Sequence, residues 1–299
     1  MKSFLCALAC SLPLATHAEP VQINSAIGQV QVEAAPATVV VLDFAALDTL
    51  GALGIGVAGR PDFTPPAYLS DYLADVPTVG TLFEPDFEAL AVMAPDLIIA
   101  GGRSQTQIPA LEKFAPTIDM TIDGNDMVAE AEARIDAYGA IFARADQAEK
   151  LDAELDQAIA DTRAAVAGKG NAMILLTNGG KISAYGANSR FGWVHSALDL
   201  PEAYEGLTPE THGEAVSFEF VAEANPDWLL VIDRGAAVGQ DGEAAAATLD
   251  NPLIARTTAA QKGQIVYLDA AALYLAGGGV QSMMLTLSEL RQAFADTNG

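Results

Sequence analysis

The chain has 299 residues, of which 51% are hydrophobic, and its formal net charge is −24. This length and composition exclude a disordered chain and suggest about two domains. The excess of acidic residues would repel nucleic acid and anionic membrane surfaces, so neither is expected as a partner.

The first 18 residues have the pattern of a signal peptide. Lys2 precedes an apolar run over 4–14, and small residues lead up to Ala18. We expect cleavage after Ala18 and a periplasmic mature chain with 14 basic and 39 acidic residues, a net charge of −25. Both cysteines, Cys6 and Cys10, lie in this segment, so the mature chain has no disulfide and no thiolate metal site. The apolar stretch before Cys10 is too short to favour a lipid anchor.

The next residues begin an alternation of strand-like and helix-like segments. Residues 21–24 and 29–32 resemble a hairpin, and 39–42 is a continuous apolar run typical of a buried parallel strand. A helix is expected over 45–53. Further strand-like runs follow at 97–100, 172–176, 229–232 and 265–268. This order predicts an α/β protein with largely parallel sheets, and no later stretch has the roughly 20 apolar residues needed to span a bilayer.

The pattern changes between residues 126 and 166, where apolar residues recur at helical spacing. We expect two consecutive helices with a break near residues 144–146. The predicted architecture is therefore two Rossmann-like α/β lobes joined by a long backbone helix. Its boundaries are 19–143 for the first lobe, 144–169 for the connecting helix and 170–299 for the second lobe.

An internal repeat supports this division. A glutamate, a Pro-Asp pair, an apolar run and an arginine recur after 131 residues: Glu88, Pro95-Asp96, 97–100 and Arg103 match Glu219, Pro226-Asp227, 228–231 and Arg234. Pro-Asp is typical of the end of a helix before a strand. Each arginine would then follow the carboxyl end of a strand, where open α/β sheets bind ligands. The two glutamates, in matching places, could dock a basic receptor surface.

Several other motifs lack the context that their chemistry needs. Residues 54–59 match the dinucleotide fingerprint but follow a helix, which favours turn glycines. Residues 277–279 lack the lysine of a phosphate loop, although these glycines could let the start of the next helix approach an anion. His195 is interpreted as structural, whereas His212, in a polar loop containing glycine, is a functional candidate. No nucleophile elbow is present, and a periplasmic hydrolase remains an alternative from a different class.

Five strings give the whole mature chain a resemblance to the periplasmic ferric-siderophore binding proteins, in particular the catecholate subgroup that handles enterobactin-type and petrobactin-type chelates. The strings lie at 101–103, 189–193, 211–219, 225–234 and 273–279. The resemblance implies a class III periplasmic binding protein of the helical-backbone type. Such proteins bind in the cleft between their lobes and move little on loading.

The resemblance also implies roles for residues in the cleft. Arg103, Arg190 and Arg234 would form a cationic triad under the chelate, because guanidinium groups donate to oxygen anions and keep their charge. His212 and Tyr274 would bind iron directly when the chelator supplies only four oxygens, since ferric iron suits a phenolate and accepts an imidazole.

The remaining implications concern partners. Glu88 and Glu219 would dock the chain on an inner-membrane ABC permease dimer. No intrinsic cofactor is implied, because Fe(III) arrives as the siderophore complex. We expect a monomeric binding protein without enzymatic activity. Haem or cobalamin capture stays open as an alternative, although three arginines favour a compact polyanion over a flat apolar ring.

Overall fold

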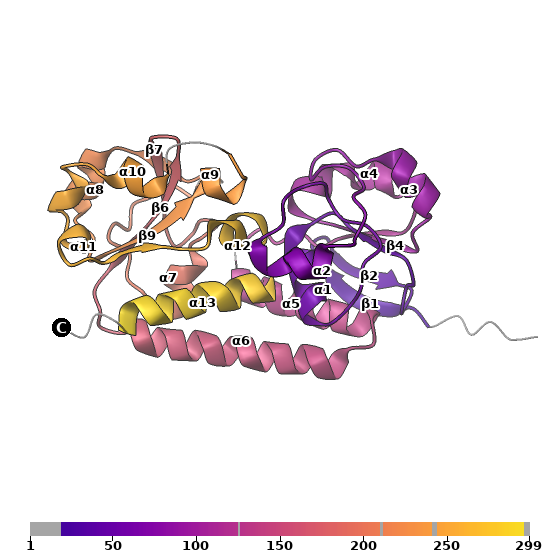
Figure 1. The fold of residues 1–299 in the computed structure, drawn as a ribbon. Helices are drawn as coiled ribbons and strands as arrows, with labels where there is room; N and C mark the ends of the chain where they lie inside the picture. The colour runs from indigo at the N-terminus through magenta and orange to yellow at the C-terminus, as the bar shows by residue number, and fades with distance from the viewer. Residues whose placement is uncertain (1–18, 125, 210–211, 241–243, 296–299) are drawn as a thin grey trace, which may run out of the picture.

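The computed structural model describes residues 19–124, 126–209, 212–240 and 244–295. The expected signal peptide, with Cys6 and Cys10, lies outside the described residues. The chain forms two α/β lobes that stand side by side above a pair of long helices (Figure 1). None of the described helices combines the length and the hydropathy that a membrane span requires.

The first lobe contains a parallel three-stranded sheet in the order β3-β4-β5 and, beside it, the antiparallel β1-β2 hairpin. Its strands are β1 (Val21–Ser25), β2 (Gly28–Val32), β3 (Val39–Val41), β4 (Leu97–Ala100) and β5 (Thr117–Asp119). Its helices are α1 (Phe44–Ala52), α2 (Ser70–Leu73), α3 (Phe87–Met93), α4 (Ile108–Leu111) and α5 (Met127–Ile141). The predicted hairpin and strands at 39–42 and 97–100 are confirmed, and every residue of β3 and β4 is buried, as expected for a parallel sheet covered on both faces.

The second lobe contains a mixed five-stranded sheet in the order β10-β9-β6-β7-β8. Its strands are β6 (Ala172–Asn178), β7 (Lys181–Tyr185), β8 (Glu214–Val216), β9 (Trp228–Asp233) and β10 (Ile265–Tyr267). The three predicted strands are parallel neighbours, but β7 and β8 extend the sheet in antiparallel fashion. The reversal after β6 occurs at Gly179 and Gly180, whose positive φ angles suit a two-residue hairpin turn.

The helices of the second lobe cover this sheet and lead to the carboxyl end of the chain. They are α7 (Trp193–Leu198), α8 (Phe218–Ala224), α9 (Arg234–Ala237), α10 (Ala245–Leu249), α11 (Thr258–Gln261), α12 (Ala270–Leu275) and α13 (Val280–Ala295). In Figure 1, α12 lies between the lobes, and α13 starts beside the first lobe and runs beneath the second toward the C-terminus.

The 22-residue helix α6 (Ala145–Val166) runs along the base of the molecule under both lobes (Figure 1). It packs against α5, α7 and α13. The predicted pair of helices is confirmed, since α5 ends at Ile141 and α6 begins at Ala145. One buried apolar cluster includes Leu47 of α1, Leu155 of α6, Ile174 of β6 and Leu287 of α13. The two lobes therefore share a continuous core.

The internal repeat reappears as two matching helices, α3 and α8. Asp86 caps the start of α3, and Ser217 caps the start of α8. Both helices end at a residue in the left-handed conformation, Ala94 and Asn225, each with a φ of +46°. A Pro-Asp pair and a buried strand follow in both lobes. The first turns of these helices carry Glu88 and Glu219, both exposed.

Candidate ligand site between the lobes

The arginines of the repeat lie where the chain leaves a central strand of each sheet. Arg103 belongs to a short 3₁₀ helix over Gly102–Gln107 that follows β4. Arg234 is the first residue of α9, directly after β9, where Asp233 caps the helix by accepting from the backbone N–H of Ala236 at 3.1 Å. Arg190 precedes α7. All three arginines are thus held on ordered turns at the edge of the interlobe space.

These three arginines converge on Tyr274 of α12. Nη2 of Arg103 and Nη2 of Arg190 donate to the carbonyl oxygen of Tyr274, at 2.9 and 2.5 Å. Nε of Arg234 donates to the Tyr274 hydroxyl at 3.2 Å. The guanidinium carbons lie 5.3, 4.8 and 5.8 Å from the ring centroid for Arg103, Arg190 and Arg234, within the range of cation–π attraction. One tyrosine therefore gathers three cationic groups from both lobes.

The same residues line a cavity of about 740 Å³. His212 also lines it and is exposed. The structure thus brings together the five residues that sequence assigned to ligand and iron, namely Arg103, Arg190, Arg234, His212 and Tyr274. The volume of this cavity falls in the range of sites for small molecules and cofactors. Glu88 and Glu219 lie apart from this cavity, on α3 and α8.

Three arginines line the cavity, whereas Asp123 is the one acid among its described lining residues. Among the described residues, no carboxylate forms a salt bridge with the three arginines. Arg234 instead donates to the neutral side chains of Asn178 and Gln240, at 3.4 and 3.3 Å. Burial, and then the charge of Arg103, lower the pKa of Arg190. In a chain of net charge −24, such a cluster is a strong local attractor for an anion.

The phenol of Tyr274 responds to this charge. Burial raises the pKa of Tyr274. The hydrogen bond from Arg234 and the charges of Arg234, Arg190 and Arg103 lower it by more, so the pKa lies below its usual value. A phenolate is a hard oxygen donor, which suits a cation such as Fe³⁺. The site can therefore offer both cationic groups for a chelate and an anionic ligand for its metal.

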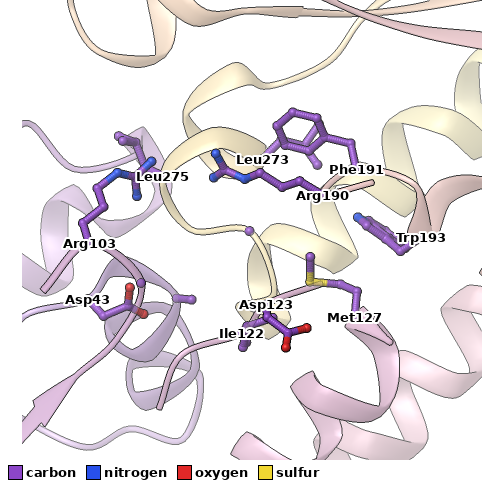
Figure 2. Close-up of a pocket in the computed structure, with 13 residues that line it drawn as sticks. Asp43, Arg103, Ile122, Asp123, Met127, Arg190, Phe191, Trp193, Leu273 and Leu275 are labelled. Atoms are coloured by element: carbon purple, nitrogen blue, oxygen red, sulfur yellow. The ribbon is translucent and has the colours of Figure 1, made fainter. Parts of the chain in front are cut away.

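A smaller cavity of about 70 Å³ adjoins the first and shares Arg103, Arg190 and Asp123 with it. Figure 2 shows Arg103 and Arg190 pointing toward each other across this space. Asp43, which caps α1, lies on the Arg103 side. Burial raises the pKa of the Asp43 carboxyl, and the hydrogen bond from the Ala46 N–H and the charge of Arg103 oppose that rise.

The glycine run 277–279 has a structural use that the sequence did not specify. The N–H groups of Gln281 and Ser282, at the start of α13, donate to the carboxylate of Asp48 on α1 at 2.7 and 2.9 Å. Tyr68 donates to the same carboxylate at 2.6 Å. A Cβ on Gly279 would lie 2.5 Å from Cγ of Asp48, so only glycine fits. The anion at this helix start is therefore an internal carboxylate that holds the α12–α13 turn against the first lobe.

Other interpretations from sequence can be checked against the geometry. His195 is buried and its Nδ1 lies 2.9 Å from the Leu200 carbonyl oxygen, which confirms the structural interpretation. Residues 54–59 follow α1 and lead into short bridges at Gly59 and Arg60, which confirms turn glycines rather than a dinucleotide site. Arg60 donates to the carbonyl groups of Pro61 and Phe63 and does not line the cavity.

Sequence reasoning missed Asn178, Gln240 and Phe83. Asn178 ends β6, so its place at the carboxyl end of a strand was a usable signal. Gln240 lies in a loop of the second lobe with no pattern of its own. Phe83 lines the large cavity from the first lobe, and an isolated phenylalanine before Glu84-Pro85 carries no sequence signal for that position.

Comparison with known proteins places these features in a family context. Residues 39–272 match the family model described as periplasmic binding protein. The petrobactin-binding protein YclQ of Bacillus subtilis is 37% identical over 86% of this chain and 82% of its own length. Its solved structure superposes with a TM-score of 0.88 at 34% identity and covers 92% of this chain and 99% of that chain.

Two further relatives come from Vibrio species. The ferric-anguibactin-binding protein FatB of Vibrio anguillarum is 29% identical over 92% of this chain and 88% of its own length. The catecholate-siderophore binding protein VctP of Vibrio cholerae superposes with a TM-score of 0.85 at 32% identity. That match covers 92% of this chain and 100% of VctP.

Proposed function

The chain belongs to the periplasmic binding protein family, and from this premise we propose that it is the substrate-binding component of an ABC-type iron–siderophore importer. Its substrate would be a ferric catecholate chelate, captured in the cavity between the lobes. The names of YclQ, FatB and VctP support this substrate class. The proposed activity is binding and delivery, so no residue has a catalytic role.

The observation that carries the proposal is the convergence of Arg103, Arg190 and Arg234 on Tyr274, in a cavity where the arginines outnumber the single acid among the described lining residues, Asp123. A ferric tris-catecholate carries about three negative charges, and three guanidinium groups match that charge and donate hydrogen bonds to catecholate oxygens. Binding would relieve the mutual repulsion of the arginines. A flat apolar macrocycle would leave the positive charges of the arginines uncompensated.

The iron shell is the second part of the proposal. When the chelator supplies four oxygens, two positions on Fe³⁺ remain, and His212 and Tyr274 line the cavity that would hold the ion. The lowered pKa of Tyr274 favours the phenolate form that iron requires. Iron is therefore cargo that enters with its chelator, and the protein completes its coordination.

The cellular part of the proposal follows the sequence. Residues 1–18 would direct export and be removed, without a lipid anchor at Cys10, to leave a periplasmic monomer. Residues 19–143 and 170–299 would be the two ligand-binding lobes, joined by the helix within 144–169. Glu88 and Glu219 would dock the loaded protein on the permease dimer of the inner membrane.

Fluorescence titration tests the proposed substrate. Trp193 lies in the wall of the smaller cavity, so it should report binding directly, whereas Trp228 is buried against Phe294 outside both cavities and should respond less. We expect a ferric bis-catecholate to quench the emission saturably, and a ferric hydroxamate and haem to bind more weakly. Arg103→Ala and Arg234→Ala should each weaken catecholate binding about tenfold to a hundredfold and reduce its dependence on salt.

Arg291→Ala is the matched control, because Arg291 is an exposed arginine of α13 that pairs with Asp161 and lies outside the cavity. Its affinity should equal that of the wild type. Preference for haem or for the hydroxamate would contradict the ligand class. Unchanged affinity in both cleft variants would contradict the assignment of the site.

A further inference from the structure

Phe83 is a large apolar side chain left exposed at the wall of a charged cavity. Its exposed fraction is 59%, and it lines the same cavity as the three arginines, His212 and Tyr274. We propose that Phe83 is a ligand-contacting residue whose ring stacks on an aromatic ring of the bound chelate. This inference rests on the proposed function and specifies which part of the chelate the first lobe recognises.

The exposure of Phe83 is imposed by an ordered loop. Oγ1 of Thr81 accepts from the N–H groups of Phe83 and Glu84 at 3.2 and 3.0 Å, and the Thr81 N–H donates to the Glu84 carbonyl at 2.9 Å. Gly80 has a φ of +93°, and a Cβ there would lie 2.3 Å from the Asp86 nitrogen. The backbone on both sides of Phe83 is thus fixed, and the side chain is presented to the cavity in a defined place.

The residues that flank the exposed pair Phe83 and Glu84 are buried. Leu82 is 3% exposed, and Pro85 is also buried, so the loop anchors itself through these two residues. None of the close aromatic pairs among the described residues includes Phe83. The ring therefore has an open face, although single exposed apolar residues elsewhere on a surface need no explanation. Phe83 differs from such residues because its ring lies in the wall of the ligand cavity.

The chemistry of the cavity gives this ring a specific use. Arg103, Arg190 and Arg234 recognise negative charge, which carboxylate and catecholate chelates share. A phenylalanine ring has neither charge nor hydrogen-bond donor, so it contributes only through apolar contact and ring stacking. A catecholate brings its own aromatic ring beside the oxygens that the arginines hold. Phe83 would therefore add affinity for chelates that carry rings.

A series of substitutions at this position tests the inference in the full chain, with a ferric bis-catecholate as the probe. Phe83→Ala and Phe83→Leu should each raise the dissociation constant, Phe83→Ala by about tenfold, because both remove the ring. Phe83→Trp should bind as tightly as the wild type. At saturation, the added emission of the tryptophan introduced by Phe83→Trp should be quenched more strongly than that of Trp228, because it would contact the coloured chelate directly.

Ile27→Ala is the control, since Ile27 is 76% exposed in the turn of the first hairpin and lies outside this cavity. It should leave affinity unchanged, and thermal melting should be similar for all variants. Wild-type affinity in Phe83→Leu, or in Phe83→Ala, would overturn the stacking role while leaving the proposed function intact. Absence of binding in the wild type would contradict the proposed function and the role of Phe83 together.

Discussion

Tyr274 joins the two chemical tasks of the site in one residue. Its carbonyl oxygen and its hydroxyl accept from the three arginines, and its ring lies within cation–π range of each of them. The same contacts that place the arginines also lower the pKa of the phenol. The residue that would bind iron is therefore activated by the groups that would hold the chelate.

Removal of the hydroxyl tests this coupling. In a complex with a ferric tetradentate bis-catecholate, Tyr274→Phe should abolish the phenolate-to-iron contribution to the visible spectrum. In the wild type that contribution should persist to a lower pH than a free phenol would allow, because the three arginines and the bound ion all favour the phenolate. Visible absorption recorded across a pH series measures both effects.

Tyr185→Phe makes the same chemical change at a nearby buried tyrosine. Burial raises the pKa of Tyr185 to about 12, although the charge of Arg190 opposes this, so it should not supply a phenolate. The spectrum of that variant should match the wild type. An unaltered spectrum in Tyr274→Phe would show that this phenol is not bound to iron.

The limits of sequence reasoning are clearest at single residues. The repeat located Arg103 and Arg234 because their positions are set by local order, a strand followed by a turn. The carboxylate of Asp48 contacts residues 233 and 234 positions away, and no local pattern encodes such a contact. Burial raises the pKa of Asp48 to about 7, against hydrogen bonds from Tyr68, Gln281 and Ser282. The glycines at 277–279 indicated that an anion could approach the start of the next helix, but only the fold identified that anion as the Asp48 carboxylate.

At the scale of elements, the apolar runs identified the strands that are buried on both faces and missed the antiparallel strands β7 and β8. The runs at 97–100 and 229–232 are fully buried central strands, so they are continuously apolar. The strand β7 begins with exposed Lys181, and in β8 no residue is fully buried. β8 is an edge strand and β7 lies next to it, and both depend on pairing with a neighbour, which the sequence of either strand alone does not reveal.

The contact between α5 and α6 contains a cluster of carboxylates. Glu132 and Asp136 lie one helical turn apart on α5, as do Asp152 and Asp156 on α6. Burial, followed by the charges of Asp136 and Glu132, raises the pKa of Asp152 to about 7. Its Oδ1 atom is buried and lacks a hydrogen-bond partner. This helix pair therefore carries a cost in stability when all four acids are ionised.

Neutralising Asp152 should stabilise the protein. The folded state binds the extra proton between the unfolded pKa of 3.8 and the folded pKa of about 7, so the free energy of unfolding falls as pH rises through this window. Asp152→Asn removes that loss. We expect a gain of about 1 kcal/mol above pH 7, reduced by solvent screening, and almost none near pH 4. Urea unfolding at the two pH values measures the difference.

Glu149→Gln is the control for this prediction, because it neutralises an exposed acid of the same helix. It should change the free energy of unfolding little at either pH. Equal stabilisation by both substitutions would mean that the gain in the free energy of unfolding comes from the change in net charge and not from the site of Asp152. A gain for Asp152→Asn that is as large at pH 4 as above pH 7 would contradict the role of the raised pKa.

At the scale of the whole molecule, the lobes are joined by more than a linker. The shared core runs from α1 through α6 and β6 to α13, and Asp48 fixes the start of α13 to the first lobe. Separation of the lobes would expose apolar surface and break hydrogen bonds to a buried carboxylate. We therefore expect the cavity to be largely formed before the ligand arrives, with the two lobes presenting their outer helices at a nearly constant spacing.

A constant spacing would matter for the proposed docking, because Glu88 and Glu219 occupy equivalent positions on α3 and α8, at the outer ends of the two lobes (Figure 1). Both side chains are exposed and lie apart from the ligand cavity. Two acids at a fixed distance can engage two basic sites of a permease dimer together. Loss of either acid should then weaken docking without changing ligand capture.

We expect Glu88→Ala and Glu219→Ala each to lower uptake of radioactive ferric bis-catecholate, and the double variant to lower it about tenfold. The assay uses cells that express the permease and depend on this chain for uptake. Fluorescence titration of the purified variants should give wild-type dissociation constants, because neither glutamate lines the cavity. Glu149→Ala, at an exposed glutamate on α6, should support normal uptake. Normal uptake by the double variant would exclude these acids from docking, whereas weakened chelate binding would show that their effect on uptake begins at the ligand site.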